Sequence, residues 1–142
     1  MTSYFAYGAN MDPVHMAERC PQATRLGVAL LAGRSFRIAA AGYGDAPPVA
    51  GGELRGVLWE LSPSDESALD GFEGVPDGLY RKERAAVRDS AGRQVDAMLY
   101  RAADPAPGRP VPGYLERIIE VAEDLGFPAG YVESLRGSGA AG

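Results

Sequence analysis

The sequence is poor in the residues that build most nucleophilic and metal sites. Its 142 residues include a single cysteine, Cys20, and a single histidine, His15. One cysteine excludes a disulfide within the chain, and one cysteine with one histidine is too few for a structural zinc site. A Ser-His-Asp or Cys-His set would have to use His15, and the Gly-x-Ser-x-Gly motif of a nucleophilic serine is missing. We therefore expect His15 to be an ordinary surface or semi-buried residue and Cys20 to be a small buried one.

Basic residues and long hydrophobic runs are scarce as well. The formal net charge is −5, Lys82 is the only lysine, and no basic stripe is present, so nucleic acid is not expected as a partner. The longest apolar runs, such as residues 28–32, are too short to span a bilayer. The first residues do not combine a basic segment with an apolar stretch, so no signal peptide is expected. These observations favour a cytoplasmic protein without a membrane partner.

The composition that remains is that of one globular domain, with 46% hydrophobic and 23% charged residues. We expect the domain to cover residues 1–136 and the glycine-rich residues 137–142 to form a disordered tail. Hydrophobic patterning predicts mostly antiparallel strands with helices placed irregularly between them, which is the α+β class. The expected strands are 3–7, 25–41 (two strands, or one with a bulge), 54–61, 79–88 and 93–101; the expected helices are 12–20, 62–70, 114–125 and 128–135; residues 42–52 and 104–112 are expected to be loops.

Local signals mark where several of these elements begin or turn. Asp12 followed by Pro13 is typical of a helix N-cap and first helical residue. Ser62 with Asp65 three residues later forms a capping-box pattern. Residues 89–92 carry a turn sequence that would join two strands as an antiparallel hairpin.

Residues 4–10 form the first candidate for a functional site. An apolar strand runs into Gly8-Ala9-Asn10 just before the helix cap, and backbone N–H groups at such a turn can hold a carboxylate or a developing oxyanion. The alternative is a plain strand-to-helix turn in which Gly8 supplies an unusual backbone conformation. The residues alone leave both interpretations open.

Glu73 is the second candidate. It lies between Phe72 and Gly74, and a carboxyl group in apolar surroundings has a raised pKa that suits proton exchange near neutrality. The alternative is a solvated loop acid, which is what most glutamates are. Tyr80 and Tyr114 are either hydroxyl donors with an apolar body or packing aromatics.

The chain resembles the gamma-glutamylcyclotransferase-like family, also called the AIG2-like or BtrG-like group. The resemblance rests on four segments in the same order, namely residues 4–11, 56–61, 69–80 and 112–131. Residues 4–11 correspond to the Tyr-Gly-Ser-Asn-type segment of the family, and residues 69–80 to the segment that holds its catalytic glutamate. The resemblance implies a single α+β domain whose mixed, mostly antiparallel sheet forms a small barrel with flanking helices.

The resemblance also implies a role for each candidate residue. Glu73 corresponds to the general acid/base, and Tyr80 and Tyr114 correspond to tyrosines whose hydroxyls contact the substrate. One departure is that Ala9 replaces the commoner serine, which removes a hydroxyl contact but keeps the backbone N–H. The substrate-binding loop falls on Tyr4, Phe5, Ala6, Tyr7, Gly8, Ala9 and Asn10.

The activity implied is cyclisation of a gamma-glutamyl amine or amino acid to 5-oxoproline and the free amine. No metal or other cofactor is expected, and the partner is the small-molecule substrate, bound by a monomer or a homodimer. Two alternatives stay open at this point. The same scaffold would also suit removal of a gamma-glutamyl protecting group during natural-product biosynthesis, or binding of a small molecule without turnover.

Overall fold

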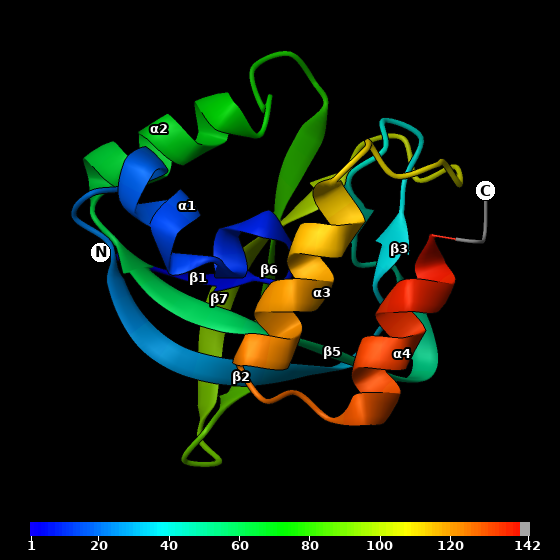
Figure 1. Cartoon of the computed structure of the whole chain (residues 1–142). Coiled ribbons are helices and arrows are strands. Elements are labelled where there is room, and N and C mark those ends of the chain that lie inside the picture. The colour runs from blue at the N-terminus through cyan, green and yellow to red at the C-terminus, as the bar shows by residue number, and fades with distance from the viewer. Residues whose placement is uncertain (140–142) are drawn as a thin grey trace.

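The fold centres on a closed five-stranded barrel (Figure 1). The computed structural model describes residues 1–139. In the barrel every neighbouring pair is antiparallel except β1 and β7, whose parallel contact closes it. The predicted α+β class with a small, mostly antiparallel barrel is confirmed. In spatial order the strands are β1 (Thr2–Ala6), β5 (Pro48–Leu61), β2 (Thr24–Arg34), β6 (Tyr80–Asp89) and β7 (Gln94–Ala102).

The barrel core excludes water by tight packing between its strands. Phe5 and Leu54 are fully buried. Gly56 lies directly against β1, because a Cβ atom there would come within 2.3 Å of the Ala6 carbonyl oxygen and 2.9 Å of the Phe5 ring. A side chain at Gly56 would therefore force the two strands apart.

The stretch 25–41 was predicted to be two strands or one strand with a bulge, and it shows both features. It forms the long strand β2, whose pairing with β5 shifts register near Gly27, and then a separate short strand, β3 (Arg37–Ile38). The hairpin predicted around residues 89–92 is confirmed as β6 and β7.

The predicted loop over residues 42–52 is wrong. Within it, β4 (Gly44–Asp45) pairs with β3, and β5 begins at Pro48. Proline is tolerated at the first residue of a strand, and the Asp45 carboxylate is tied to β7 by a buried ion pair with Arg101. Contacts with distant parts of the chain therefore order a segment whose local composition indicates a loop.

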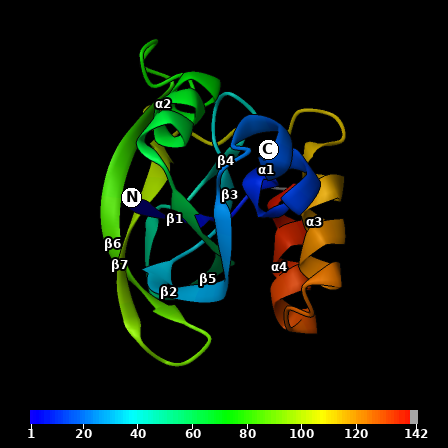
Figure 2. The ribbon, with the colours of Figure 1, turned by 90° about the vertical axis from the view of Figure 1, so that its left-hand side faces the viewer.

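The helices lie at one end and along one side of the barrel (Figures 1 and 2). Asp12 Oδ1 accepts from the Val14 N–H at 3.0 Å, and Ser62 Oγ accepts from the Asp65 N–H at 3.1 Å, so both predicted caps are confirmed. Figure 2 shows α3 and α4 together on the side away from the β6–β7 hairpin. The helices are the 3-10 turn η1 (Ala9–Met11), α1 (Pro13–Arg19), α2 (Pro63–Phe72), α3 (Tyr114–Asp124) and α4 (Ala129–Ser138).

The last helix is longer than its sequence indicates. α4 continues to Ser138 instead of stopping at Leu135, so Gly137 is helical and does not belong to a tail. The rest of the predicted tail, residues 140–142, lies outside the described residues. Within residues 1–139, no helix combines the length and the hydropathy needed to cross a membrane.

Candidate active site

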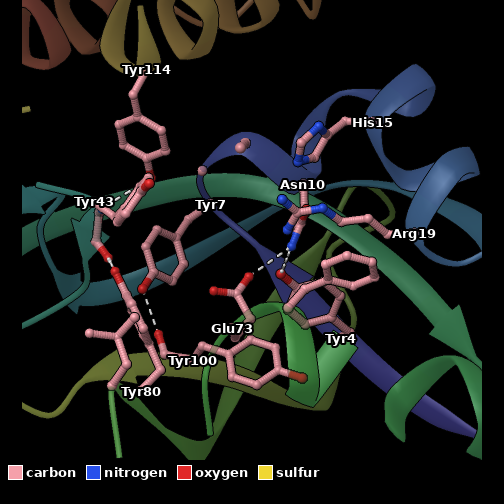
Figure 3. Close-up of a pocket in the computed structure, with 15 residues that line it drawn as sticks. Tyr4, Tyr7, Asn10, His15, Arg19, Tyr43, Glu73, Tyr80, Tyr100 and Tyr114 are labelled. Carbon is pink, nitrogen blue, oxygen red and sulfur yellow. Dashed lines mark hydrogen bonds between the residues drawn. The ribbon is translucent and has the colours of Figure 1, made fainter. Parts of the chain in front are cut away.

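A cavity of about 350 Å³ lies where the end of β1 meets the helices (Figure 3). Figure 3 shows the Glu73 carboxyl group between a cluster of tyrosines on one side and Asn10 with Arg19 on the other. Segments far apart in the sequence build it, including β1, η1, α1, the end of α2, and the first residues of β6 and α3. The lining residues are Tyr4, Tyr7, Gly8, Ala9, Asn10, His15, Arg19, Tyr43, Gly44, Phe72, Glu73, Leu79, Tyr80, Tyr100 and Tyr114.

Glu73 reaches the cavity because α2 ends in a defined turn. The Gly74 N–H donates to the Gly71 carbonyl at 3.1 Å, and the Val75 N–H donates to the Asp70 carbonyl at 3.0 Å. This pair of bonds is the Schellman motif, which needs a left-handed residue after the C-cap. Gly74 supplies it with φ of +70°. The glycine that ends the helix is thus Gly74 and not Gly71, and Glu73 is the C-cap.

Asn10 holds the Glu73 carboxyl group in place. Its Nδ2 donates to Glu73 Oε1 at 3.1 Å and to the Tyr4 hydroxyl at 2.9 Å, so both amide hydrogens are used. The indole N–H of Trp59 donates to the Asn10 carbonyl at 3.0 Å and fixes the backbone at that point. Asn10 therefore connects the turn after β1 to the end of α2.

The surroundings of Glu73 favour its neutral form. Burial raises the pKa of Glu73 above its ordinary value of 4.5, and the charge of Arg19 and the hydrogen bond from Asn10 offset part of that rise. Glu73 is half-buried and lines the cavity. A carboxyl group in such a setting can take up and return a proton closer to neutral pH than a solvated glutamate.

The backbone of Gly44 holds two tyrosine hydroxyls in different hydrogen-bonding states. Tyr80 donates its hydroxyl hydrogen to the Gly44 carbonyl at 2.6 Å. Tyr114 accepts from the Gly44 N–H at 2.8 Å, and within residues 1–139 its own hydrogen has no acceptor. Burial raises the pKa of both tyrosines, so both hydroxyls are neutral. The Tyr114 hydroxyl can thus donate a hydrogen bond to a ligand, whereas the Tyr80 hydroxyl can only accept one.

Gly8 is required at its position by the space that Tyr114 occupies. A Cβ atom on Gly8 would lie 2.9 Å from the Tyr114 hydroxyl oxygen. The residue therefore does more than provide a turn, because its backbone approaches a buried hydroxyl that a side chain would displace.

A row of charged side chains, of which Asp45 and Arg101 are buried, fixes the strand that carries Gly44. Asp45 Oδ1 accepts from Arg101 Nε at 2.9 Å and from the Ala102 N–H at 3.0 Å. Glu83 binds Arg101 at 2.9 Å and Arg34 at 3.1 Å. The ion pairs join β4 to β7, β6 and β2, and so hold the backbone on which Tyr80 and Tyr114 depend.

Most of the predicted site residues come together, with two corrections. Phe5 is fully buried and lies against Gly56 in the barrel, because successive side chains of a strand point to opposite faces. Ala6 is also buried and does not reach the cavity. The residues that do line it together with Glu73 are Tyr4, Tyr7, Gly8, Ala9, Asn10, Tyr80 and Tyr114.

Several lining residues were not predicted from the sequence, although two of them had a visible signal. His15 and Arg19 are four residues apart on a helix and so share one face. His15 is half-buried as predicted, but it lines the cavity, and burial lowers its pKa so that it is neutral. Cys20 is buried as predicted, and burial raises the pKa of its thiol to about 11. The other residues missed are Tyr43, Gly44, Phe72, Leu79 and Tyr100.

These features define a class, namely a small α+β barrel protein with one carboxyl group in a tyrosine-lined cavity. Within residues 1–139, no three His, Cys, Asp or Glu side chains are grouped so as to hold a metal ion. Acid–base chemistry by Glu73, assisted by neutral hydroxyl and backbone donors, is what this arrangement can perform.

Comparison with known proteins places the chain in a family. The model of the AIG2-like family matches residues 53–135, so the chain belongs to the AIG2-like family. The human gamma-glutamylcyclotransferase is 28% identical over 143 residues, which covers 94% of this chain and 76% of the relative. The bovine gamma-glutamylcyclotransferase is also 28% identical, over 142 residues covering 93% of this chain and 76% of the relative.

Solved structures show the same fold. A structure described as gamma-glutamyl cyclotransferase superposes with a TM-score of 0.87 at 26% identity, covering 95% of this chain and 86% of that one. The Bacillus subtilis protein YkqA superposes with a TM-score of 0.84 at 26% identity, covering 99% of this chain and 54% of that one. The similarity therefore extends over the whole barrel and its helices.

Proposed function

We propose that the protein is a gamma-glutamylcyclotransferase, which converts a gamma-glutamyl amine or amino acid into 5-oxoproline and a free amine. The observation that carries the proposal is the position of Glu73, a lone acid with a raised pKa that faces neutral donors across a cavity. The relatives named gamma-glutamylcyclotransferase support it, because the chain aligns with them over nearly all of its length.

In the proposed reaction the substrate supplies its own nucleophile. The α-amino nitrogen attacks the γ-carbonyl carbon, the new C–N bond closes the five-membered ring, and the original C–N amide bond breaks. Glu73 accepts a proton from the α-ammonium group and delivers a proton to the departing nitrogen. One carboxyl group suffices because these transfers occur one after the other.

The protons balance in this scheme. The α-nitrogen loses two protons as it changes from an ammonium group to a lactam N–H, and the departing amide nitrogen gains two as it becomes an ammonium ion. Glu73 ends each cycle in the state in which it began. The scheme therefore needs only residues that this chain provides.

The tyrosine side of the cavity is assigned to the glutamyl group. The free hydroxyl hydrogen of Tyr114 and the backbone at Gly8 and Ala9 would hold the glutamyl carboxylate or the developing oxyanion. Holding the extended substrate in a folded, reactive geometry can lower the barrier by roughly 7–11 kcal/mol. Ala9 keeps its N–H for this purpose although it lacks a serine hydroxyl.

Product analysis tests the proposal directly. The purified protein is incubated with a panel of gamma-glutamyl amino acids and gamma-glutamyl amines, and the products are identified by mass spectrometry. We expect 5-oxoproline together with the free amine. Tight binding of these compounds without any product would support a binding protein and contradict the proposal.

Tyr114 and Tyr80 should differ in their contribution to turnover. Tyr114→Phe removes a hydrogen that is free to reach the substrate, and we expect kcat/KM to fall roughly tenfold, about the value of one hydrogen bond. Tyr80→Phe removes a hydroxyl whose hydrogen is already used by Gly44, so its effect should be smaller. Steady-state kinetics of both variants checks this order, and a larger loss for Tyr80→Phe would contradict the assignment.

The pH dependence of turnover should respond to Asn10. Glu73 must be ionised to accept a proton, so activity rises as the pH passes its pKa, which burial raises. Asn10→Ala removes the hydrogen bond that lowers this pKa. We expect the acidic limb of the pH profile of kcat/KM to move to higher pH. A limb that stays in place or moves to lower pH would show that Glu73 is not the group that titrates.

A further inference from the structure

A second cavity, of about 370 Å³, lies between the β3–β4 pair, the loop that follows β7, and α4. Figure 1 shows β3 beside the upper end of α4. The second cavity shares no lining residue with the active-site cavity, and its volume is in the range of small-molecule sites. Its lining is mostly apolar and is supplied by Phe36, Ile38, Ala39, Pro47, Pro105 and Pro107.

Phe36 lies between the second cavity and the active site. Its ring packs edge-on against the ring of Tyr7, with 6.3 Å between the two ring centres. The same ring lies close to β4, because a Cβ atom on Gly44 would come within 2.7 Å of it. Tyr7 and Gly44 line the active-site cavity, whereas Phe36 lines only the second one. A ligand in the second cavity therefore has a binding site of its own, with Phe36 as the dividing wall.

Two opposite charges lie next to each other in the second cavity. Arg37 and Asp45 are directly opposite each other in the β3–β4 pair, and both line the cavity. They form no ion pair, because Asp45 binds Arg101 instead. Within residues 1–139, no carboxylate lies within salt-bridge distance of Arg37. Asp45 Oδ1 accepts from Arg101 and from the Ala102 N–H, whereas Oδ2 has no donor in the described part of the chain.

We propose that the second cavity binds a free α-amino acid with an aromatic side chain. The guanidinium group of Arg37 pairs with the carboxylate of the ligand, and Asp45 Oδ2 accepts from its ammonium group. An α-amino acid carries both charges on one carbon atom, which suits two charged residues that are cross-strand neighbours. The aromatic ring of the ligand packs against Phe36 and the prolines. This site goes beyond the proposed cyclotransferase activity and does not depend on it.

A set of matched compounds tests the three parts of the proposed site. Calorimetry compares phenylalanine with phenethylamine, which lacks the carboxylate, hydrocinnamate, which lacks the ammonium group, and glycine, which lacks the side chain. We expect the Kd of phenylalanine to be lower than that of each other compound by at least about fivefold. A Kd for any of the three that equals or falls below that of phenylalanine would overturn the inference, as would no binding of phenylalanine at millimolar concentration.

A substitution at Arg37 tests the carboxylate end of the site. Because Arg37 is exposed at the edge of the cavity, Arg37→Gln should raise the Kd of phenylalanine about fivefold and change that of phenethylamine less than about twofold. Arg88→Gln alters an exposed arginine that lines neither cavity and should change neither Kd. An unchanged Kd of phenylalanine in Arg37→Gln, at an unchanged Tm, would overturn the assignment.

Competition experiments separate the second cavity from the active site. Glu73→Gln, which cannot exchange the proton, is saturated with gamma-glutamyl-glycine before phenylalanine is added. We expect phenylalanine to bind without displacing the first compound, and this result supports the second site whether or not the unaltered protein releases 5-oxoproline. Displacement of gamma-glutamyl-glycine by phenylalanine would place the amino acid in the active site and overturn the inference.

Discussion

Glu73→Gln should abolish the release of 5-oxoproline. The amide has nearly the shape of the carboxyl group and accepts a hydrogen bond from Asn10, but it cannot take up or return a proton. General acid–base groups contribute about 10²–10⁴-fold to rate, so we expect kcat to fall by at least about 100-fold with a smaller change in substrate affinity. Single-turnover product analysis with calorimetry measures both effects. Near-normal kcat in this variant would remove Glu73 from the mechanism.

The same substitution should not destabilise the protein at neutral pH. Because the pKa of Glu73 is raised by folding, ionisation of the folded state costs stability once the pH rises through that raised value. At a pH well below 4.5, both folded and unfolded states hold the proton and the cost disappears. We expect the Tm of Glu73→Gln to equal or exceed that of the unaltered protein at about pH 7, with less advantage at about pH 4. If the Tm of Glu73→Gln fell strongly at neutral pH, the lost activity would be explained by misfolding instead of by the missing proton transfer.

Asp45→Ala should cause a large loss of stability, although Asp45 supports the site from outside the cavity. Asp45 is buried, and its removal leaves the buried Arg101 with Glu83 as its remaining partner. Breaking a buried ion pair by removing one partner costs about 3–5 kcal/mol, and we expect about 3 kcal/mol because Glu83 stays. For a chain of this size the Tm should fall by roughly 10 °C. Thermal and urea unfolding measure the change.

A surface ion pair provides the matched control for Asp45. Asp96 pairs with Arg84 at 2.8 Å between exposed positions of β7 and β6. Asp96→Ala also removes an aspartate from an arginine, but exposed pairs contribute about 0–1 kcal/mol. We expect little change in Tm for Asp96→Ala and unaltered turnover. Similar losses in both variants would show that burial is not what makes the Asp45 pair strong.

Helix caps and the hairpin could be predicted from the sequence because their signals are local. Asp12 and Ser62 bond N–H groups within three residues of themselves, so the pattern contains the whole interaction. The segment at residues 42–52 could not be predicted in this way. Its order depends on Asp45 meeting Arg101, 56 positions further along the chain, and glycine and proline composition carries no information about that contact.

The candidate site also contains residues that local motifs predict and residues that depend on distant contacts. Glu73 and the turn at Gly8 stand in recognisable motifs, whereas the residues that complete the cavity arrive from separate elements. Tyr43 and Tyr100 have no motif and become site residues only when the barrel closes. Phe5 shows the converse, because it belongs to the recognised segment but faces the barrel core.

Oxygen-18 labelling tests the proposed cyclisation most directly, because it shows whether water contributes oxygen to the product. The protein is incubated with gamma-glutamyl-leucine in water enriched in oxygen-18, and the products are weighed by mass spectrometry. Intramolecular attack by the α-amine, assisted by Glu73, predicts 5-oxoproline without the heavy isotope and free leucine in equal amount. Glutamate carrying oxygen-18 in its γ-carboxylate would show that water is the nucleophile, and would contradict the cyclisation that the cavity is proposed to catalyse.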